Sequence, residues 1–490
     1  MTASPYKKFI KDVILVGIVD SFKSLRALII IPILTKTLGA GGYGMWIQIR
    51  VAIMFFVPIV VLGLDRAIVC FLAGKHKTEE ISDAFFSSLA VTLSLGLVCA
   101  GIIYAFSDYL SVFILGTGDF SYFVKLAALL LLLICLDHMT LIYFQTFRQM
   151  KNHFIFLSLE SLGEVLLVAF MVFNGFGILG VLFSLIVIKM AFFIFKFLEI
   201  ISQIGLKMPT FLEIKKYIRY GYPLAIAYLF YFLINYSDRY IINYFSGVEK
   251  VGIYSVAYAV GSIIIIIMTS IIYVLHPALA DCLNNKKLDE AKRYVQYFFK
   301  FSLMFMIPIA LVMSVAAKKL ILLFSTSEFL AAQYCVPFIA TGFVIFGIGI
   351  VGEYIIILKE RTSLISWLYV ILAFFNIIGN IILVPRFGII GAAAATFLTF
   401  IGYAVFTISL SRRYLAFSLD YLFVFKSIMV SSCVLLLILK LAPLTVLGMI
   451  LFIMGGIALY FICLYVLKGI NKKEIAFFKD LVFRGARSQS

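Results

Sequence analysis

Long apolar runs alternate with short polar stretches along almost the whole chain. A helix that crosses a membrane needs about 20 mostly apolar residues, and runs of this length predict fourteen such helices, grouped as six, six and two. The pattern therefore predicts an all-α polytopic membrane protein. The predicted helices lie near residues 13–35, 44–66, 83–106, 121–144, 153–173, 177–199, 219–243, 251–275, 296–316, 332–357, 363–384, 388–411, 420–440 and 444–467.

Two glycine-containing patterns recur about 210 residues apart. The stretch LGAGGYGMW at 38–46 matches SGVEKVGIY at 246–254, and FGILG at 176–180 recurs as FGIIG at 387–391. Nearly equal offsets, 208 and 211 residues, indicate an internal duplication. Because each repeat holds an even number of helices, the two repeats are expected to lie parallel in the membrane. The first match aligns Gly39 with Gly247 and Gly44 with Gly252.

The repeat boundaries divide the chain into four regions. We expect an N-terminal six-helix lobe over residues 1–205 and a C-terminal six-helix lobe over 206–415. An added helix pair occupies 416–470, and a basic cytoplasmic tail occupies 471–490. No predicted loop is long enough to hold a soluble catalytic domain, so the sequence favours a transporter over an enzyme.

Composition agrees with a membrane protein. Of 490 residues, 64% are hydrophobic and 13% are charged, whereas soluble domains carry roughly 25% charged residues. The net charge of +17 would suggest a nucleic-acid partner in a soluble protein, but here we interpret it as charge that orients the helices. The seven cysteines show no paired spacing, and we expect neither a disulfide nor a metal site.

Basic residues are distributed unevenly between the two ends of the predicted helices. One set of helix ends carries 28 Lys and Arg, including Lys196, and the other carries 6. Lys and Arg accumulate on the cytoplasmic side of membrane proteins. We therefore expect a multi-pass protein of the plasma (inner) membrane with both termini in the cytoplasm.

We single out seven ionisable residues inside predicted helices of the first half. Such groups are unfavourable in lipid and usually face a cavity or a partner. One interpretation is a water-filled cavity whose cations attract a phosphate or an acidic sugar, since arginine can donate two hydrogen bonds to a phosphate. The alternative is a set of structural ion pairs between helices. The candidate anion-binding cations are Arg26, Arg50, Lys23 and Lys189, and the candidate coupling carboxylates are Glu160, Glu164 and Asp20.

The second half offers only secondary candidates. Asp238 and Arg239 lie towards the outer end of their helix and either anchor it or contribute to a site. Asn376 and Asn380, four residues apart on one helix face, are neutral candidates near the middle of the membrane. The pair Asp137-His138 has no metal-type or catalytic partner at useful spacing, and we assign it no site. The chain has no nucleotide-binding motif; we therefore expect no cofactor, and coupling to an H+ or Na+ gradient or to the membrane potential.

Three stretches of the sequence resemble one family. These are PILTKTLGAGGYGMW, YGYPLA with the following YSDRYIINYF and VGIYSVAYAV, and NIIGNIILVPRFGIIGAAAAT. They are similar to Wzx-type polysaccharide transporters, the O-antigen flippases of the multidrug/oligosaccharidyl-lipid/polysaccharide (MOP) exporter superfamily. The resemblance covers residues 10–415, and the fourteen-helix plan extends it to the end. It implies two six-helix lobes that form a V-shaped cavity, and a final helix pair that forms a groove for a lipid tail.

The resemblance also implies a function. Wzx-type proteins carry undecaprenyl-diphosphate-linked oligosaccharides from the cytoplasmic to the outer leaflet by alternating access. The related lipid II flippases use arginines on their first two helices, which Arg26 and Arg50 match in approximate depth. They also place an arginine on helix 8, whereas residues 251–275 hold no charged residue, which argues against a lipid II substrate.

We therefore expect a flippase of a lipid-linked oligosaccharide, the repeat unit of a polysaccharide. The alternatives are a cation-coupled multidrug antiporter of the same superfamily, a lipid II flippase and, less favoured, a membrane polysaccharide polymerase. The expected partners are the polyprenyl-diphosphate-linked oligosaccharide and the lipid bilayer, with no nucleic acid. A polysaccharide polymerase and assembly proteins are further candidate partners.

Overall fold

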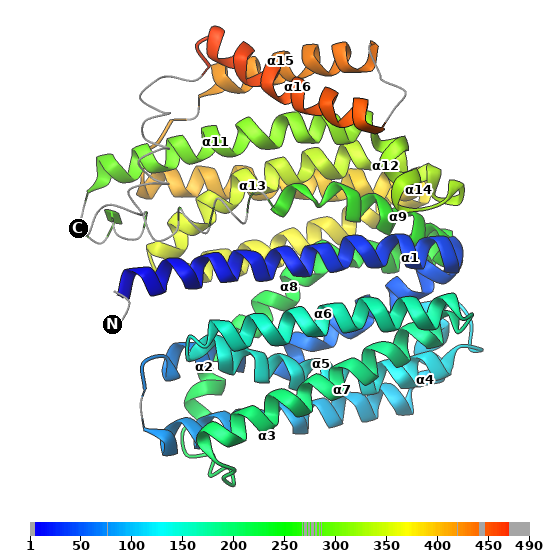
Figure 1. Cartoon of the computed structure of the whole chain (residues 1–490), viewed down its shortest axis with the longest axis vertical. Helices are drawn as coiled ribbons and strands as arrows, with labels where there is room; N and C mark the ends of the chain where they lie inside the picture. Colours follow the sequence, from blue (N-terminus) through cyan, green and yellow to red (C-terminus); the bar gives the residue numbers. More distant parts are fainter. Residues whose placement is uncertain are drawn as a thin grey trace. The chain divides into compact units, whose positions relative to one another are not determined.

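In the part of the chain that it describes, the computed structural model consists of α-helices joined by short connections, with one 3-10 helix (Figure 1). It describes residues 5–75, 77–266, 287–418, 420–440 and 446–469, together with positions 268, 272, 275, 279, 282, 283 and 285. Side chains are described from Arg26 onward, except over 438–454. The side chains of Asp20 and Lys23 and the predicted tail at 471–490 lie outside the described part.

Within the described residues, the predicted apolar segments fall mostly on helices. The helices are α1 (Pro5–Val61), α2 (Leu64–Leu72), α3 (Thr78–Ala105), α4 (Ser107–Leu115), α5 (Ser121–Thr146), α6 (Met150–Phe173), α7 (Gly177–Ile204), α8 (Ile214–Ser246), α9 (Val248–Gly261), α11 (Leu288–Val315), α12 (Ala317–Phe324), η1 (Ser327–Tyr334), α13 (Val336–Leu358), α14 (Thr362–Tyr414), α15 (Tyr421–Lys440) and α16 (Val446–Val466). Within the described residues, nine helices are long and apolar enough to cross a membrane.

Two of these helices each cover two predicted crossings. At a rise of about 1.5 Å per residue, the 57 residues of α1 would span about 85 Å, far more than a hydrocarbon core of about 30 Å. The helix breaks at Gly39, which has φ 66° and ψ −177°, and α14 breaks at Gly388, with φ 56° and ψ −136°. Only glycine adopts such angles without strain. The predicted number of crossings, fourteen, stays a prediction.

The chain forms two compact units. The first comprises Met1–Ala257, Ile321–Ala332 and Ser366–Thr396, and the second comprises Tyr258–Leu320, Gln333–Ile365 and Phe397–Ser490. In the first unit α5 packs against α3 and α7, while α1 packs against α5, α6 and α8 (Figure 1). In the second unit α11 packs against α13 and α15, and α15 packs against α16. The predicted lobe boundaries at residues 205 and 415 stay a prediction.

The glycines of the recurring patterns adopt matching backbone conformations. Gly39 has φ 66° and ψ −177°, and Gly247 has φ 84° and ψ 165°. In the second pattern, Gly177 has φ 54° and its counterpart Gly388 has φ 56°. A positive φ is unusual for any residue but glycine, so its recurrence at aligned positions supports the internal duplication.

The first helix pair of one repeat crosses the first helix pair of the other repeat at the aligned glycines. A Cβ atom on Gly44 would collide with the backbone carbonyl of Val248, and one on Gly252 would collide with that of Ala40. All four residues belong to the first unit. Glycine is required on both sides because the two backbones approach too closely for any side chain between them.

Two reciprocal hydrogen bonds accompany this crossing. The Thr35 hydroxyl donates to the Phe324 carbonyl at 2.7 Å, and the Asn243 side-chain amide donates to the Ile114 carbonyl at 3.0 Å. The donors are 208 residues apart and the acceptors 210, so each repeat supplies an equivalent donor to the other. Beside the Gly39 break, the Glu328 carboxylate accepts the Ala40 N–H at 3.0 Å. Because equivalent contacts occur twice, the crossing has an approximate twofold symmetry.

A substitution at Gly44 tests this crossing. We expect Gly44→Ala to lower the thermal unfolding midpoint of the purified protein in detergent, since overpacking costs about 1–3 kcal/mol. The matched control is Gly41→Ala in the same helix, where an added Cβ meets nothing within 4 Å. Alanine favours helix by up to about 1 kcal/mol over glycine, so the control should be neutral or stabilising. Equal midpoints for the two variants would contradict the tight crossing.

Candidate functional site

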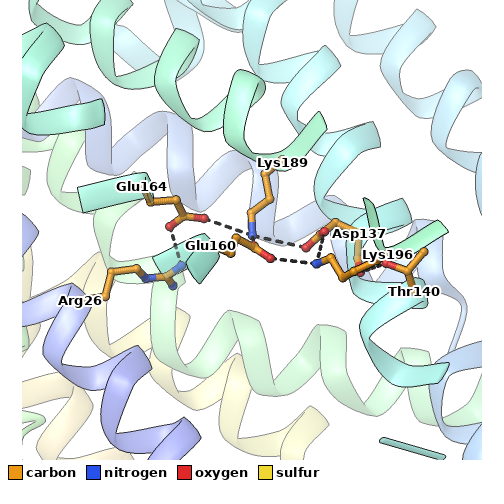
Figure 2. A network of polar contacts seen from close by, with 7 residues as sticks. All are labelled: Arg26, Asp137, Thr140, Glu160, Glu164, Lys189 and Lys196. Carbon is orange, nitrogen blue, oxygen red and sulfur yellow. Dashed lines mark hydrogen bonds and ion pairs between the residues drawn. The ribbon is translucent and has the colours of Figure 1, made fainter. Parts of the chain in front are cut away.

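Six ionisable side chains from four helices meet inside the first unit (Figure 2). We call them the ion-pair cluster. They are Arg26 from α1, Asp137 from α5, Glu160 and Glu164 from α6, and Lys189 and Lys196 from α7.

Helical spacing explains why these side chains can meet. Residues three or four apart lie on one face of a helix, which places Glu160 and Glu164 together on α6. Lys189 and Lys196 are seven residues apart, close to two full turns of about 3.6 residues, so they also share a face of α7. Because α6 packs against both α1 and α7, the two carboxylates lie between cations on either side.

The cluster is a continuous chain of ion pairs. Arg26 Nη1 lies 2.5 Å from Glu164 Oε2, and Glu164 Oε1 lies 3.2 Å from Lys189 Nζ. Lys189 also pairs with Asp137, at 3.5 Å, and with Glu160. Lys196 completes the chain by pairing with Glu160 at 2.8 Å and with Asp137. Each of the three carboxylates therefore contacts at least one cation.

Exposure falls along this chain. The Arg26 side chain is 31% exposed, that of Lys189 is 16% exposed and that of Lys196 is fully buried. The carboxylates are 4–6% exposed. The cluster thus has an accessible end at Arg26 and a buried end at Lys196.

Three cations balance three carboxylates. Removing a charge from water is unfavourable by several kcal/mol, and removing one partner of a buried pair is strongly destabilising because the other charge stays uncompensated. Balanced charge therefore lets these helices pack. A ligand that binds the accessible end has to compete with Glu164 for Arg26.

The cluster joins four of the candidates that the sequence identified: Arg26, Glu160, Glu164 and Lys189. Sequence reasoning missed Asp137, to which it assigned no site. It also counted Lys196 among the cytoplasmic flanking charges, and this is wrong, because the side chain is fully buried in the cluster. The seven-residue spacing from Lys189 is the signal that could have identified it.

Arg50 lies apart from the cluster. It follows the Gly39 break on α1 and is exposed. It forms no ion pair or hydrogen bond with any residue in the described part of the chain. Its charge is therefore available to an anion.

Asp238 and Arg239 support the anchoring interpretation. Both side chains are buried, and Arg239 Nη1 lies 2.6 Å from Asp238 Oδ1. The Tyr254 hydroxyl donates to Asp238 Oδ2 at 2.6 Å, and Gln48 donates to the Arg239 carbonyl at 2.9 Å. The Arg239 guanidinium also lies over the Tyr254 ring, 5.2 Å from its centre. These contacts connect α8 with α9 and α1 beside the glycine crossing.

The two asparagine candidates contact each other. Asn376 and Asn380 are fully buried in α14. Asn380 Nδ2 donates to Asn376 Oδ1 at 3.0 Å, and the Ser237 hydroxyl donates to the same oxygen at 3.3 Å. This neutral hydrogen-bonded group links α8 and α14 within the first unit.

Family models match most of the chain. One described as "Polysaccharide biosynthesis protein" matches residues 9–283, and one described as "MatE" matches residues 223–382. An uncharacterized membrane protein of Methanocaldococcus jannaschii is 24% identical over 375 residues, which cover 70% of this chain and 72% of that protein.

Solved structures show the same fold. The lipid II flippase MurJ in an inward closed conformation aligns with a TM-score of 0.75 at 16% identity, over 96% of this chain and all of that one. An inward-facing multidrug resistance MATE family transporter of the MOP superfamily aligns with a TM-score of 0.68 at 15% identity, over 80% of this chain and 94% of that one.

The buried end of the cluster can be tested through stability. We expect Lys196→Met to lower the free energy of unfolding by about 3–5 kcal/mol, because Asp137 and Glu160 lose a buried partner. The measurement is the thermal unfolding midpoint in detergent. Lys207→Met is the matched control, since Lys207 and its partner Glu79 are 48% and 87% exposed and such pairs contribute about 0–1 kcal/mol.

A second variant checks charge balance. Adding Asp137→Asn to Lys196→Met removes one charge of each sign and should recover part of the lost stability. A double variant as unstable as the sum of the two single variants would show that the pairing does not matter.

Proposed function

Because the chain belongs to the polysaccharide biosynthesis protein family of the MOP superfamily, we propose that it is a flippase of lipid-linked oligosaccharide. It moves an undecaprenyl-diphosphate-linked repeat unit from the cytoplasmic to the outer leaflet by alternating access. The chain is a multi-pass membrane transporter and not an enzyme. In the proposed orientation both termini are cytoplasmic, as the distribution of Lys and Arg predicts.

The observation that carries this proposal is the partly exposed side chain of Arg26 at the end of a buried ion-pair chain. A diphosphate offers several oxygens to which arginine can donate paired hydrogen bonds. Arg26 is 31% exposed and is held by one carboxylate oxygen of Glu164. An anionic headgroup therefore binds Arg26 by displacing Glu164, which keeps Lys189 as a partner at 3.2 Å.

This exchange provides a basis for ion coupling. When the diphosphate takes Arg26, three carboxylates share only Lys189 and Lys196, so the buried part carries one excess negative charge. A proton or Na+ on Glu164 or Glu160 restores the balance. Uptake of the cation and binding of the substrate then favour each other, as linkage requires.

Arg50 is proposed as a second contact for the anionic headgroup. It is exposed and has no ion-pair partner in the described part of the chain. Lys23, three residues before Arg26 on the same helix, is proposed to add positive charge. A multidrug antiporter is the second candidate, because the MatE model matches residues 223–382. An organic cation would be repelled by Arg26, so this candidate requires another binding site.

The first functional prediction concerns export in cells. Arg26→Ala should leave the lipid-linked oligosaccharide on the cytoplasmic leaflet, because the diphosphate loses its bidentate donor. Arg26→Ala combined with Glu164→Gln keeps the cluster neutral and should block export in the same way at normal protein level. The measurement is leaflet accessibility of the oligosaccharide in cells that lack the native gene. Arg386→Ala, at an exposed arginine with no ion pair in the described part of the chain, should restore export fully. Normal export by Arg26→Ala would contradict the assignment.

The second functional prediction concerns Glu164. Glu164→Gln removes the charge that competes for Arg26, so the purified protein should bind pyrophosphate about five- to tenfold more tightly by calorimetric titration. Glu213→Gln is the control, because Glu213 lies outside the cluster and forms an exposed ion pair with Lys216. Equal affinities of the two variants would contradict the exchange.

A further inference from the structure

Two adjoining cavities lie in the second unit, where α14 ends and α15 begins. One has a volume of about 290 Å³ and the other about 190 Å³, and Tyr421 lines both. The first is also lined by Arg412, Phe417 and Ser418, and the second by Gln296, Lys300, Asp420 and Phe423. We call the pair the α14–α15 site.

Each cavity is lined by a basic side chain that lies over an aromatic ring. The Arg412 guanidinium lies 5.6 Å from the centre of the Phe417 ring, and Lys300 Nζ lies 5.1 Å from the centre of the Phe423 ring. Both rings are buried, at 7% and 2% exposure. An aromatic face holds a cation in place without a carboxylate, so the donors of Arg412 remain available to a ligand.

The charge of the site is positive. Asp420 is the only carboxylate among the residues that line the two cavities. It lies 3.4 Å from Lys300 Nζ, and its Oδ1 accepts the Phe423 N–H at 2.9 Å, at the start of α15. Arg412 forms no ion pair with any described residue. Basic residues in the last turn of α14 also interact favourably with the helix dipole. The dipole alone does not explain why Arg412 lies over the Phe417 ring at the edge of a cavity.

Neutral donors and an apolar surface complete the site. The Ser418 hydroxyl lies in the larger cavity and accepts from Gln296 Nε2 at 2.8 Å. Along the first turns of α15, Tyr421, Leu422 and Phe425 are 68%, 63% and 65% exposed. A ligand that fits therefore has an anionic head for the cavity and a hydrocarbon chain that lies along α15.

We propose that the α14–α15 site binds the phosphodiester headgroup of an anionic membrane phospholipid. Arg412 holds the phosphate oxygens through paired hydrogen bonds, with Ser418 and Tyr421 as further donors. The acyl chains lie against the exposed apolar side chains of α15. The charge distribution predicts that this end of α14 is cytoplasmic, where anionic lipids are concentrated. This proposal goes beyond the flippase function and is independent of Arg26.

Native mass spectrometry of the full-length protein in an uncharged detergent tests the proposal. The probes are phosphatidylglycerol and phosphatidylcholine with the same acyl chains. We expect the protein to bind phosphatidylglycerol at least about fivefold more tightly, and Arg412→Ala to reduce that affinity to the level of phosphatidylcholine. Arg386→Ala, at an exposed arginine on another part of α14, is the matched control and should keep the preference.

Additional measurements distinguish a membrane phospholipid from free phosphate and from the transported lipid. Inorganic phosphate at equal concentration should not displace phosphatidylglycerol, because it lacks the chains that contact α15; displacement would overturn the lipid assignment. Binding of polyprenyl phosphate that is tighter than phosphatidylglycerol and also lost in Arg412→Ala would assign the site to the transported lipid instead. If Arg412→Ala does not fold, Arg412→Lys keeps the charge and loses the paired donors. An unchanged preference in that variant would overturn the role of Arg412.

Discussion

The packing of the first helices depends on the neutralisation of three buried carboxylates by three cations. Apolar helices gain little from one another in lipid, because the hydrocarbon chains are as apolar as their side chains. Polar contacts therefore decide which helices meet and in what register. Here Glu160 and Glu164 place α6 between α1 and α7, and Lys189 extends the contact to α5 through Asp137. A shift of any one helix would leave a charge uncompensated.

The duplicated repeats are equivalent in backbone but not in chemistry. At the glycine crossing, each repeat contributes one of the aligned glycines and one of the two hydrogen-bond donors. In contrast, the six residues of the ion-pair cluster all come from the first repeat, whereas the second contributes the neutral pair Asn376 and Asn380, fully buried and hydrogen-bonded to each other. Because the buried charges of the cluster belong to the first repeat, an anion can change the packing of that repeat while the packing of the second repeat stays the same.

The sequence predicted the helices well because lipid imposes a length and an apolar composition that can be counted. It also predicted the paired glycines, because a positive φ at these positions favours glycine over every other residue. It could not predict which helices meet. Asp137 was dismissed and Lys196 was placed among the flanking charges, because their pairing depends on how α5 and α7 pack. The short helices α2, α4 and α12 and the η1 turn were also missed, since eight or nine residues are too few for a crossing.

The break at Gly39 gives α1 two separate roles. Its first part carries Arg26, whose partner Glu164 an anion would displace. Its second part is held by the Gly44 crossing and by the hydrogen bond from Gln48 to the Arg239 carbonyl. A glycine with positive φ lets the two parts of a helix take different directions at little conformational cost. We therefore infer that a substrate at Arg26 can reorient the first part of α1 relative to α6 while the crossing stays in place. Such a division between a responsive and a fixed segment is compatible with the proposed alternating access around a bound headgroup.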